Sequence, residues 1–489
     1  MYETNQRETC SQLTQPTEIP AEADGNYVVE VIKNNRKKHL IKTNLYRPHK
    51  SPPKPENLFP KVPVIVCNTA EEFYSQDLKN FCMHPKNPVS IIRGGCKAAG
   101  INLEYFTTRS MVKRAPNAPI EIRKQTVQSP DFNVNNGKVI WLCSSPREWK
   151  PLRTYALYQS RLFREKNAHE NPNVITYGED LDFGTNLDLS DEKLWKAELE
   201  ELGKLPYWIQ YKHEKNLLSY VGQPVLGVNT VQAYIKVPGS RTPGHQENLC
   251  TCAVNINIGP GDTSWLSTPE EYWPALDELC KKNRVNYLED PWWPAIDELI
   301  DAGIPVHRYI QRPGDIVFLN AGTPHWVQAD GFCNNIAWNC LPMQKFHFDV
   351  AVERYELNLQ RKFQSLVPME RVTWNLAAAG LELDFEMFAS VRYFLQRSMF
   401  TLANSVKFIK SKGIKIIQQA DDQQLRFCED CDCELYTLLW IKDSGNSDEV
   451  SVPYCKDCAE SKEYQSWVVV QQYTVRKLQI MYDKLKLKW

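Results

Sequence analysis

The chain has 489 residues, of which 42% are hydrophobic and 24% charged, and this ordinary globular composition excludes wholesale disorder or a fibrous chain. With 58 Lys and Arg against 59 Asp and Glu, the formal net charge is −1, so total charge provides no attraction to nucleic acid or membrane. No apolar run is long enough to span a bilayer, and the polar start lacks the order of a signal peptide, so we expect a soluble intracellular protein.

The first predicted segment, residues 1–58, is polar and becomes rich in proline near its end. Between Glu30 and Lys61 nine basic residues stand against two acidic ones, a local excess of +7. We interpret this segment as a disordered, solvated basic tail. A nuclear import signal around Arg36–Lys38 is the alternative.

Residues 59–205 are predicted to form a mixed, mainly helical region. Apolar density rises from Pro63 onward, and Val62–Val66 is typical of a buried strand. Residues 150–205 are charged and favour helices, with a loop around Asn167–Asn173.

The centre of the chain, residues 206–350, is rich in short strands. Four segments alternate apolar and polar side chains with the period of a strand: Thr230–Val237, Ala253–Ile258, Asp315–Leu319 and Asn335–Trp338. Glycine and proline turns separate these segments without the helices of a parallel sheet. The pattern therefore predicts an antiparallel barrel or jelly roll.

An acidic segment with a small internal repeat interrupts these strands. The run from Trp273 to Leu279 (WPALDEL) recurs as Trp293–Leu299 (WPAIDEL), and proline after tryptophan predicts the start of a short helix in each copy. From Ser267 to Asp301 nine acidic residues stand against three basic ones, a balance of −6. The default interpretation is a solvated helix surface, and the functional alternative is an acidic rim that attracts a basic peptide.

After residue 350 the period becomes helical, and we expect a helical linker over 351–420. The apolar residues at helical spacing are Val352, Tyr355, Leu359, Phe363, Leu366, Phe388, Val391, Leu395, Leu402, Val406 and Ile409. We interpret these stripes as core contacts between helices.

His245 and Glu247 are two residues apart, so on a strand their side chains leave the same face, and His325 follows far along the chain. Two histidines and a carboxylate can bind Fe(II) and leave positions open for a chelating co-substrate and dioxygen. Alone the pattern is weak, because nine His give accidental pairs. Lys236, on the strand just upstream, could pair with a co-substrate carboxylate. Zinc is a rival metal, although the helical spacing of zinc proteases is missing.

Most of the 15 cysteines are scattered singly, and one cluster near the C-terminus has the spacing of metal ligands. Without a secretory signal a disulfide framework is not expected, and we interpret the scattered ones as buried apolar side chains: Cys10, Cys67, Cys82, Cys96, Cys143, Cys280, Cys333 and Cys340. Within residues 421–489, Cys428, Cys431, Cys455 and Cys458 form two C-x₂-C pairs that predict a closed structural zinc site. Cys433 is a nearby fifth thiol that could compete.

Four motifs together resemble the UTX-type subfamily of Jumonji-C histone lysine demethylases, from about Pro63 through the C-terminal cysteines. The motifs are Lys236–Asn248 (KVPGSRTPGHQEN), Val254–Asp262 (VNINIGPGD), Gln311–Asp315 (QRPGD) and Cys333–Asn339 (CNNIAWN). The resemblance implies a mixed α+β fold with a double-stranded β-helix (jelly-roll, cupin-like) catalytic domain at 206–350, a helical linker and a Cys₄ zinc-binding domain.

The resemblance also implies roles for individual residues. The iron ligands would be His245, Glu247 and His325. The co-substrate 2-oxoglutarate would be held by Lys236, Thr242 and Asn255, with Tyr234 lining the pocket. Zinc would be bound by Cys428, Cys431, Cys455 and Cys458, in a module that helps to grip the histone tail. Ala253 stands where the family usually has a serine near the co-substrate, which removes one hydrogen bond worth about 1 kcal/mol.

The implied activity is oxidative demethylation of trimethylated and dimethylated lysine 27 of histone H3, with release of formaldehyde and succinate and an effect on transcription. The implied partners are the H3 tail and chromatin in the nucleus; we expect no membrane partner and no direct sequence-specific DNA binding, and the sequence does not fix the oligomeric state. The tetratricopeptide array of some members is not among these residues, so partners recruited through it are not assumed. A protein hydroxylase with the same iron site and a catalytically silent chromatin-binding scaffold are the alternatives.

Overall fold

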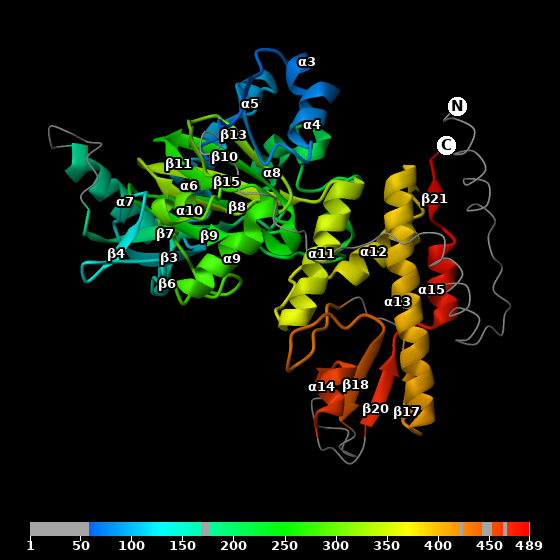
Figure 1. Cartoon of the computed structure of the whole chain (residues 1–489). Coiled ribbons are helices and arrows are strands. Elements are labelled where there is room, and N and C mark those ends of the chain that lie inside the picture. The colour runs from blue at the N-terminus through cyan, green and yellow to red at the C-terminus, as the bar shows by residue number, and fades with distance from the viewer. Residues whose placement is uncertain (1–57, 168–176, 420–423, 443–451, 463–466, 489) are drawn as a thin grey trace. The chain divides into compact units, whose positions relative to one another are not determined.

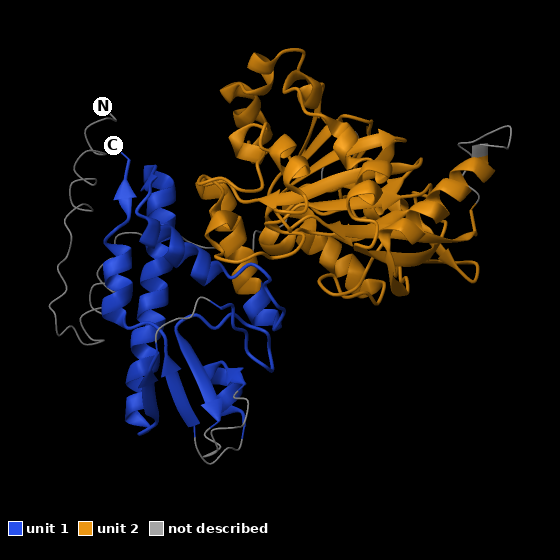
Figure 2. Ribbon diagram, turned by 180° about the vertical axis from the view of Figure 1, so that it is seen from behind, with its two compact units in different colours: residues 1–43, 358–489 blue, residues 44–357 orange. Residues whose placement is uncertain are grey.

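The computed structural model describes residues 58–167, 177–419, 424–442, 452–462 and 467–488. These residues form two compact units, one ending at Leu357 and one beginning at Asn358 (Figure 2). The predicted basic tail, its import signal, Cys10 and most of the loop near Asn167–Asn173 lie outside the described residues. Among the helices of the described segments, none has both the length and the apolarity that crossing a membrane requires.

A nine-stranded, largely antiparallel sheet is the centre of the first unit. Its strands, in sheet order, are β1 (Val64–Val66), β2 (Val89–Arg93), β13 (Ile316–Leu319), β10 (Cys252–Pro260), β15 (Cys333–Cys340), β8 (Gln232–Lys236), β7 (Asp180–Asp188), β3 (Pro119–Thr126) and β6 (Arg147–Pro151). A four-stranded antiparallel sheet consists of β12 (His307–Gln311), β11 (Thr263–Ser267), β14 (His325–Ala329) and β9 (Arg241–His245). The hairpin of β4 (Asn133–Asn135) and β5 (Lys138–Ile140) is separate.

The two sheets face each other, because one apolar cluster draws residues from both. Ile91, Ala253 and Val317 of the large sheet pack there with Trp265 and Val327 of the small sheet. Alternate residues of the large sheet point to its other face, where they form a second core with the helices of this unit. The double-layered antiparallel arrangement confirms the predicted jelly roll.

Helices cover the outer face of the large sheet (Figure 1). The helical elements of this unit are α3 (Ala70–Phe73), α4 (Gln76–Cys82), α5 (Gly95–Ala98), η2 (Leu103–Phe106), α6 (Thr108–Arg114), α7 (Leu152–Asn167), α8 (Lys196–Leu202), η3 (Tyr207–Ile209), η4 (Leu217–Tyr220), η5 (Asn248–Cys250), η6 (Glu270–Tyr272), α9 (Trp273–Lys282), α10 (Ile296–Asp301) and α11 (Lys345–Arg361). The scattered cysteines that the structure describes are all buried, as predicted.

Two predictions for the region before residue 206 are wrong. The strand near Val64 exists, but Val64 and Val66 are 46% and 53% exposed, because β1 is the edge of the sheet and has one neighbour. The charged stretch 150–205 is not helical throughout, since Asp180–Asp188 is a strand paired with β3. Buried Leu181, Phe183 and Leu187 alternate with polar residues there, and the acidic residues obscured that period.

The acidic segment covers the outer face of the small sheet. Its residues Leu276, Trp292 and Leu299 pack with Leu266 of β11 and Trp326 of β14 in one apolar cluster. The first copy of the repeat forms α9 as predicted, but the second helix begins only at Ile296, because the backbone of Trp292 bridges to β9 at Gly244. The acidic residues of the segment stay mostly at the surface, where Glu278, Glu289 and Asp297 are exposed, so the predicted solvated helix surface is present while the apolar side chains pack on the sheet.

The second unit combines helices with a small sheet. Its helices are α12 (Met369–Ala379), α13 (Phe385–Ser411), α14 (Lys456–Glu460) and α15 (Val475–Tyr482), and α12, α13 and α15 pack against one another (Figure 1). Its strands are β17 (Lys415–Gln418), β20 (Trp467–Gln471), β18 (Leu438–Lys442) and β19 (Pro453–Tyr454) in one sheet and β16 (Glu382–Leu383) with β21 (Lys486–Leu487) in another. The long stripe on α13 is confirmed, whereas Phe363 and Leu366 follow the end of α11 and Leu366 is exposed.

Candidate metal centres

Two neighbouring strands of the small sheet bring the three predicted iron ligands together. His245 is the last residue of β9 and His325 is the first residue of β14, and the two are paired across the strands. Glu247 follows two residues after His245, where the chain leaves the sheet. The imidazole centroids of the two histidines lie 4.2 Å apart. Sheet register thus joins residues that are 80 positions apart in the sequence.

The ligand atoms of this triad point at one another. Glu247 Oε1 lies 3.7 Å from His245 Nε2 and 3.5 Å from His325 Nε2, and the three ligand atoms are within 4.8 Å of each other. His245 Nδ1 donates to the carbonyl of Pro243 at 2.8 Å, and His325 Nδ1 donates to that of Thr323 at 3.0 Å. With Nδ1 protonated, each Nε2 presents its lone pair, so the three groups fit a metal ion.

The protonation states of Glu247 and His325 also suit metal binding. Burial alone would raise the pKa of Glu247, but the hydrogen bond and charge of His245, with the charge of His325, lower it to about 2. Burial and the neighbouring His245 lower the pKa of His325 to about 4. For His245 the interaction with Glu247 outweighs burial and raises the pKa. At neutral pH the carboxylate is therefore ionised and His325 is neutral.

Gln246, between the two ligands, braces both ligand-bearing segments. Its Nε2 donates to the carbonyl of Gly322 at 2.5 Å, three residues before His325, and its Oε1 accepts from Arg354 of α11. Arg354 is buried, donates to Cys250 Sγ and lies over the ring of Trp273. Sequence reasoning missed Gln246 and Arg354; the position of Gln246 inside the H-x-E motif was the one available signal.

The polar residues predicted for the co-substrate lie mostly on the inner face of the large sheet. Ala233 and Ile235 of β8 point to the outer core, so Tyr234 and Lys236 point into the roll, where Lys236 Nζ is 5.7 Å from the Tyr234 ring. Lys236 is 4% exposed, burial lowers its pKa, and it forms no ion pair with a described carboxylate. A buried cation with no carboxylate beside it among the described residues is suited to an anionic ligand such as 2-oxoglutarate. Thr242 lies in β9, opposite Val327.

A chain of amides fixes the orientation of Asn255. Its Oδ1 accepts from Gln311 Nε2 at 3.2 Å and from Asn335 Nδ2 at 2.9 Å, and Gln311 Oε1 in turn accepts from Trp265 Nε1 at 2.9 Å. The Trp265 ring is stacked on His325, with centroids 5.8 Å apart. The chain therefore links the proposed co-substrate residue Asn255 to His325, one of the three predicted iron ligands. Sequence reasoning missed Gln311, Asn335 and Trp265, although the first two lie within the quoted motifs.

Ala253 faces the same interior as Asn255, two residues along β10, and packs in the apolar cluster between the sheets. Its methyl group supplies no hydrogen bond to a co-substrate. The rest of the inner polar row is in place, so a missing hydroxyl here removes at most one bond among several.

The acidic segment contacts the triad through one tryptophan. Gly244, adjacent to His245, donates its N–H to the carbonyl of Trp292 at 2.6 Å, and a Cβ built on Gly244 would lie 1.8 Å from the Trp292 ring. Trp292 is fully buried, stacked on Tyr287 and in edge contact with Trp326. The segment thus supports the strand that ends in His245, a predicted iron ligand.

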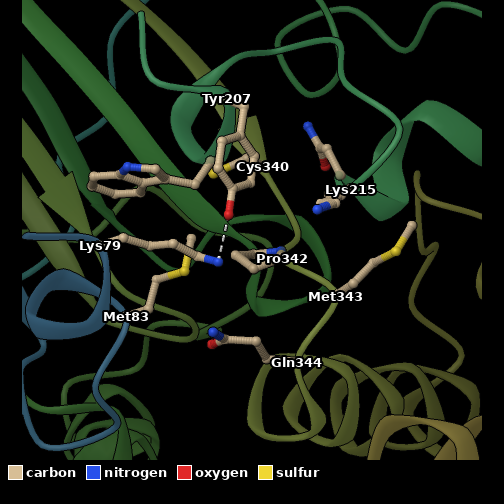
Figure 3. Close-up of a pocket in the computed structure, with 10 residues that line it drawn as sticks. Lys79, Met83, Tyr207, Lys215, Cys340, Pro342, Met343 and Gln344 are labelled. Carbon is tan, nitrogen blue, oxygen red and sulfur yellow. Dashed lines mark hydrogen bonds between the residues drawn. The ribbon is translucent and has the colours of Figure 1, made fainter. Parts of the chain in front are cut away.

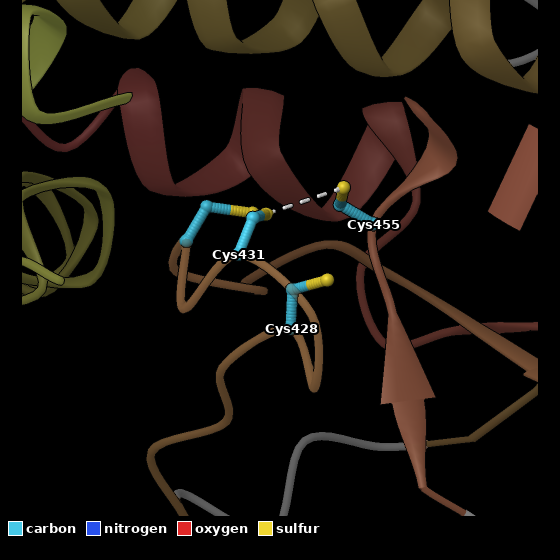
Figure 4. A group of neighbouring side chains, drawn as sticks. Cys428, Cys431 and Cys455 are labelled. Carbon is cyan, nitrogen blue, oxygen red and sulfur yellow. Dashed lines mark hydrogen bonds between the residues drawn. The ribbon is translucent and has the colours of Figure 1, made fainter. Parts of the chain in front are cut away.

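Three of the four predicted zinc ligands, Cys428, Cys431 and Cys455, gather in the second unit (Figure 4). The Sγ atoms of Cys428, Cys431, Cys433 and Cys455 lie within 4.8 Å of one another, and Cys431 Sγ and Cys455 Sγ are 3.8 Å apart. Four sulfurs at 2.3 Å from a tetrahedral zinc ion are separated by about 3.8 Å, so the thiols fit that ion. Cys458 lies beside this group, because its N–H donates to Cys455 Sγ at 3.4 Å.

A separate cavity of about 60 Å³ lies beside the outer core of the first unit (Figure 3). Lys79 Nζ donates to the Tyr207 hydroxyl at 2.8 Å, and the Nζ atoms of Lys79 and Lys215 are 5.1 and 5.3 Å from the centroid of its ring. None of the three iron-ligand candidates lines this cavity, so it is distinct from the triad.

Three family models match the chain in succession. They are the JmjC domain, hydroxylase, at residues 232–340; the lysine-specific demethylase 6/UTY C-terminal helical domain at 347–420; and the KDM6 GATA-like domain at 418–475. The triad and the proposed co-substrate residues fall within the first match and the cysteines within the third. The fold and site thus define a JmjC protein.

Curated relatives support a narrower grouping. Lysine-specific demethylase 6B of Homo sapiens is 38% identical over 458 residues, covering 88% of this chain, and lysine-specific demethylase jmjd-3.1 of Caenorhabditis elegans is 30% identical over 443 residues, covering 82%. The chain spans 28% and 41% of the lengths of these relatives. With its helical and GATA-like domains, the chain belongs to the lysine-specific demethylase 6 family.

Proposed function

We propose that this protein removes methyl groups from trimethylated and dimethylated lysine 27 of histone H3 in an oxidative reaction that depends on Fe(II) and 2-oxoglutarate. The observation that carries the proposal is the convergence of His245, Glu247 and His325 at one end of the jelly roll. Membership of a family whose named members are lysine-specific demethylases supports the substrate class.

In this proposal His245 Nε2, Glu247 Oε1 and His325 Nε2 would hold Fe(II). When bound, the iron with 2-oxoglutarate and dioxygen supplies the oxidation of an N-methyl group. The protein supplies binding and orientation. The Nδ1–H groups of both histidines, held by the Pro243 and Thr323 carbonyls, keep the ring planes fixed.

The inner face of the large sheet would hold the co-substrate. Lys236 would neutralise a carboxylate of 2-oxoglutarate in a setting where water competes little, because its side chain is buried. Asn255 presents its amide nitrogen, since its Oδ1 already accepts from Gln311 and Asn335. The hydroxyl of Thr242 would contribute to holding the co-substrate, and the ring of Tyr234 would line the pocket.

The proposed partners follow from the substrate. The enzyme would act on the H3 tail of chromatin in the nucleus and would regulate transcription by changing the methylation of that tail. Cys428, Cys431, Cys455 and Cys458 would hold a structural zinc ion that stabilises the module next to the helical domain.

Formaldehyde release separates this function from the alternatives. The purified chain, given Fe(II), 2-oxoglutarate and an H3 peptide trimethylated at lysine 27, should release formaldehyde and succinate in equal amounts. His245→Ala should abolish both, while exposed His84→Ala should leave both unchanged. Succinate with a stably hydroxylated peptide and no formaldehyde would indicate a protein hydroxylase, and neither product would indicate a scaffold.

A further inference from the structure

Five thiols, one more than a tetrahedral zinc ion can bind, surround the zinc position of the second unit. Cys428, Cys431 and Cys455 belong to both the predicted and the observed set. Cys433 lies within 4.8 Å of their sulfur atoms, and the N–H of Cys458 donates to Cys455 Sγ. Spacing alone assigns the fourth place to Cys458. In the structure, however, it is Cys433 whose Sγ completes a set of four within 4.8 Å.

The backbone holds Cys433 in this place. Asp432, just before it, adopts a φ of +54°, its N–H donates to the Cys428 carbonyl, and the Cys433 carbonyl accepts from Cys428 N–H at 2.9 Å. Phe427 and Glu434 pair across the turn. The turn therefore directs the side chain of Cys433 toward the same centre as those of Cys428 and Cys431.

The residue after Cys433 anchors the turn from the other side. Both carboxylate oxygens of Glu434 accept backbone N–H groups at the start of α12, from Glu370 at 3.0 Å and Arg371 at 2.8 Å. A carboxylate at a helix N-terminus is favourable because it satisfies free N–H groups. Cys433 is thus held between the cysteine turn and a helix, and it is not a surface thiol that happens to lie nearby.

We propose that Cys433 and Cys458 are alternative fourth ligands of one zinc ion, with Cys428, Cys431 and Cys455 as its permanent ligands. In the exchange the zinc–sulfur bond to Cys458 breaks as the bond to Cys433 forms, and the proton of the Cys433 thiol passes to the released Cys458 thiolate. Ligand number and net charge are unchanged. The site would keep its metal when either of the two cysteines is chemically blocked.

Zinc content and cobalt spectra of the full chain test this exchange. Cys458→Ser and Cys433→Ser should each keep one metal ion per chain and, with Co(II), the visible and sulfur charge-transfer bands of four-thiolate tetrahedral coordination. The double variant should lose that spectrum and bind zinc about 100-fold more weakly, and so should the control Cys431→Ser. Loss of the four-thiolate spectrum in Cys458→Ser alone would overturn the proposal.

A measurement on the unaltered chain covers the case in which a variant fails to fold. With zinc bound, limited alkylation followed by peptide mass spectrometry should modify Cys433 and Cys458 each in part, never both in one chain, with zinc retained. Cys428, Cys431 and Cys455 should be protected. Complete alkylation of Cys433 together with complete protection of Cys458 would overturn the proposal. Neither experiment depends on demethylation.

Discussion

Replacement of Gly244 by alanine tests whether the acidic segment supports the iron site. The added Cβ would lie 1.8 Å from Cζ3 and 1.9 Å from Cε3 of Trp292. Carbon atoms in contact are about 3.5–4.0 Å apart, so the ring or the strand must move by roughly 2 Å. The ring has no free direction, because it is fully buried against Tyr287 and Trp326 and its Nε1 donates to the Tyr287 carbonyl at 3.0 Å.

The expected loss has two parts. Overpacking a well-packed core costs about 1–3 kcal/mol, and a weakened buried hydrogen bond of Trp292 adds about 1 kcal/mol, so the free energy of unfolding should fall by roughly 2–4 kcal/mol. A shift of β9 also moves His245, the next residue. We therefore expect Fe(II) affinity to fall by at least about tenfold, in the range found when the support of a metal ligand is lost.

Urea unfolding and anaerobic Fe(II) titration calorimetry measure these two effects. The matched control is Gly203→Ala, because Gly203 has an ordinary helical φ of −63° and its Cβ would meet nothing closer than 3.2 Å. A second variant, Gly244→Ala with Trp292→Leu, should lose less stability than the sum of the two single changes, since the smaller side chain relieves the contact. Unfolding of Gly244→Ala within 0.5 kcal/mol of the parent (about the scatter of a neutral substitution) with unchanged iron binding would refute the reasoning.

Three further predictions concern pH, the brace and the acidic surface. Burial lowers the pKa of His347 to about 3, against 6.5 unperturbed, so the unfolded chain takes up a proton first as pH falls below 6.5. The free energy of unfolding should therefore fall from pH 6.5 down to 3, by about 2 kcal/mol at pH 5. His347→Gln should flatten this part of a series of denaturations at different pH, and an unchanged slope would contradict the prediction. Gln246→Met removes the hydrogen bonds of Gln246 with the Gly322 carbonyl and with Arg354, and it should lower Fe(II) affinity by about 10- to 100-fold in anaerobic titration. Unaltered affinity would show that these hydrogen bonds do not position the predicted ligands. If the acidic surface borders the peptide, Glu278→Lys should weaken binding of the H3 peptide, most at low salt, and equal affinity at every ionic strength would contradict this. Asp277 is unsuitable for the test, because it is buried and paired with Lys281 and its charge reversal would disturb folding.

The sequence was sufficient where the chemistry is local. The period of a strand predicted β8, β10, β13 and β15. Two C-x₂-C pairs predicted the thiol cluster, because cysteine spacing of this kind is rare by chance. In each case a short motif contains most of the information that the fold later uses.

The contacts that the sequence could not predict depend on the register between strands and on which segment covers a face of a sheet. The amide chain from Asn255 to Trp265 exists only because β10, β12 and β15 are aligned so that Gln311 and Asn335 point inward. The contact of Trp292 with Gly244 joins residues 48 positions apart across an irregular segment, and no periodicity of apolar residues in the sequence predicts it. Cys433 breaks the pair spacing and enters the cluster through the turn at Asp432.

Mass spectrometry of H3 peptides tests the central proposal most directly. The chain should convert a peptide trimethylated at lysine 27 to the dimethylated and then the monomethylated form, only when both Fe(II) and 2-oxoglutarate are present, and Glu247→Gln should leave the peptide intact. Peptides trimethylated at other lysines should remain unchanged. Persistence of the trimethylated peptide with correctly folded, iron-loaded protein, or loss of methyl groups without 2-oxoglutarate, would contradict the account.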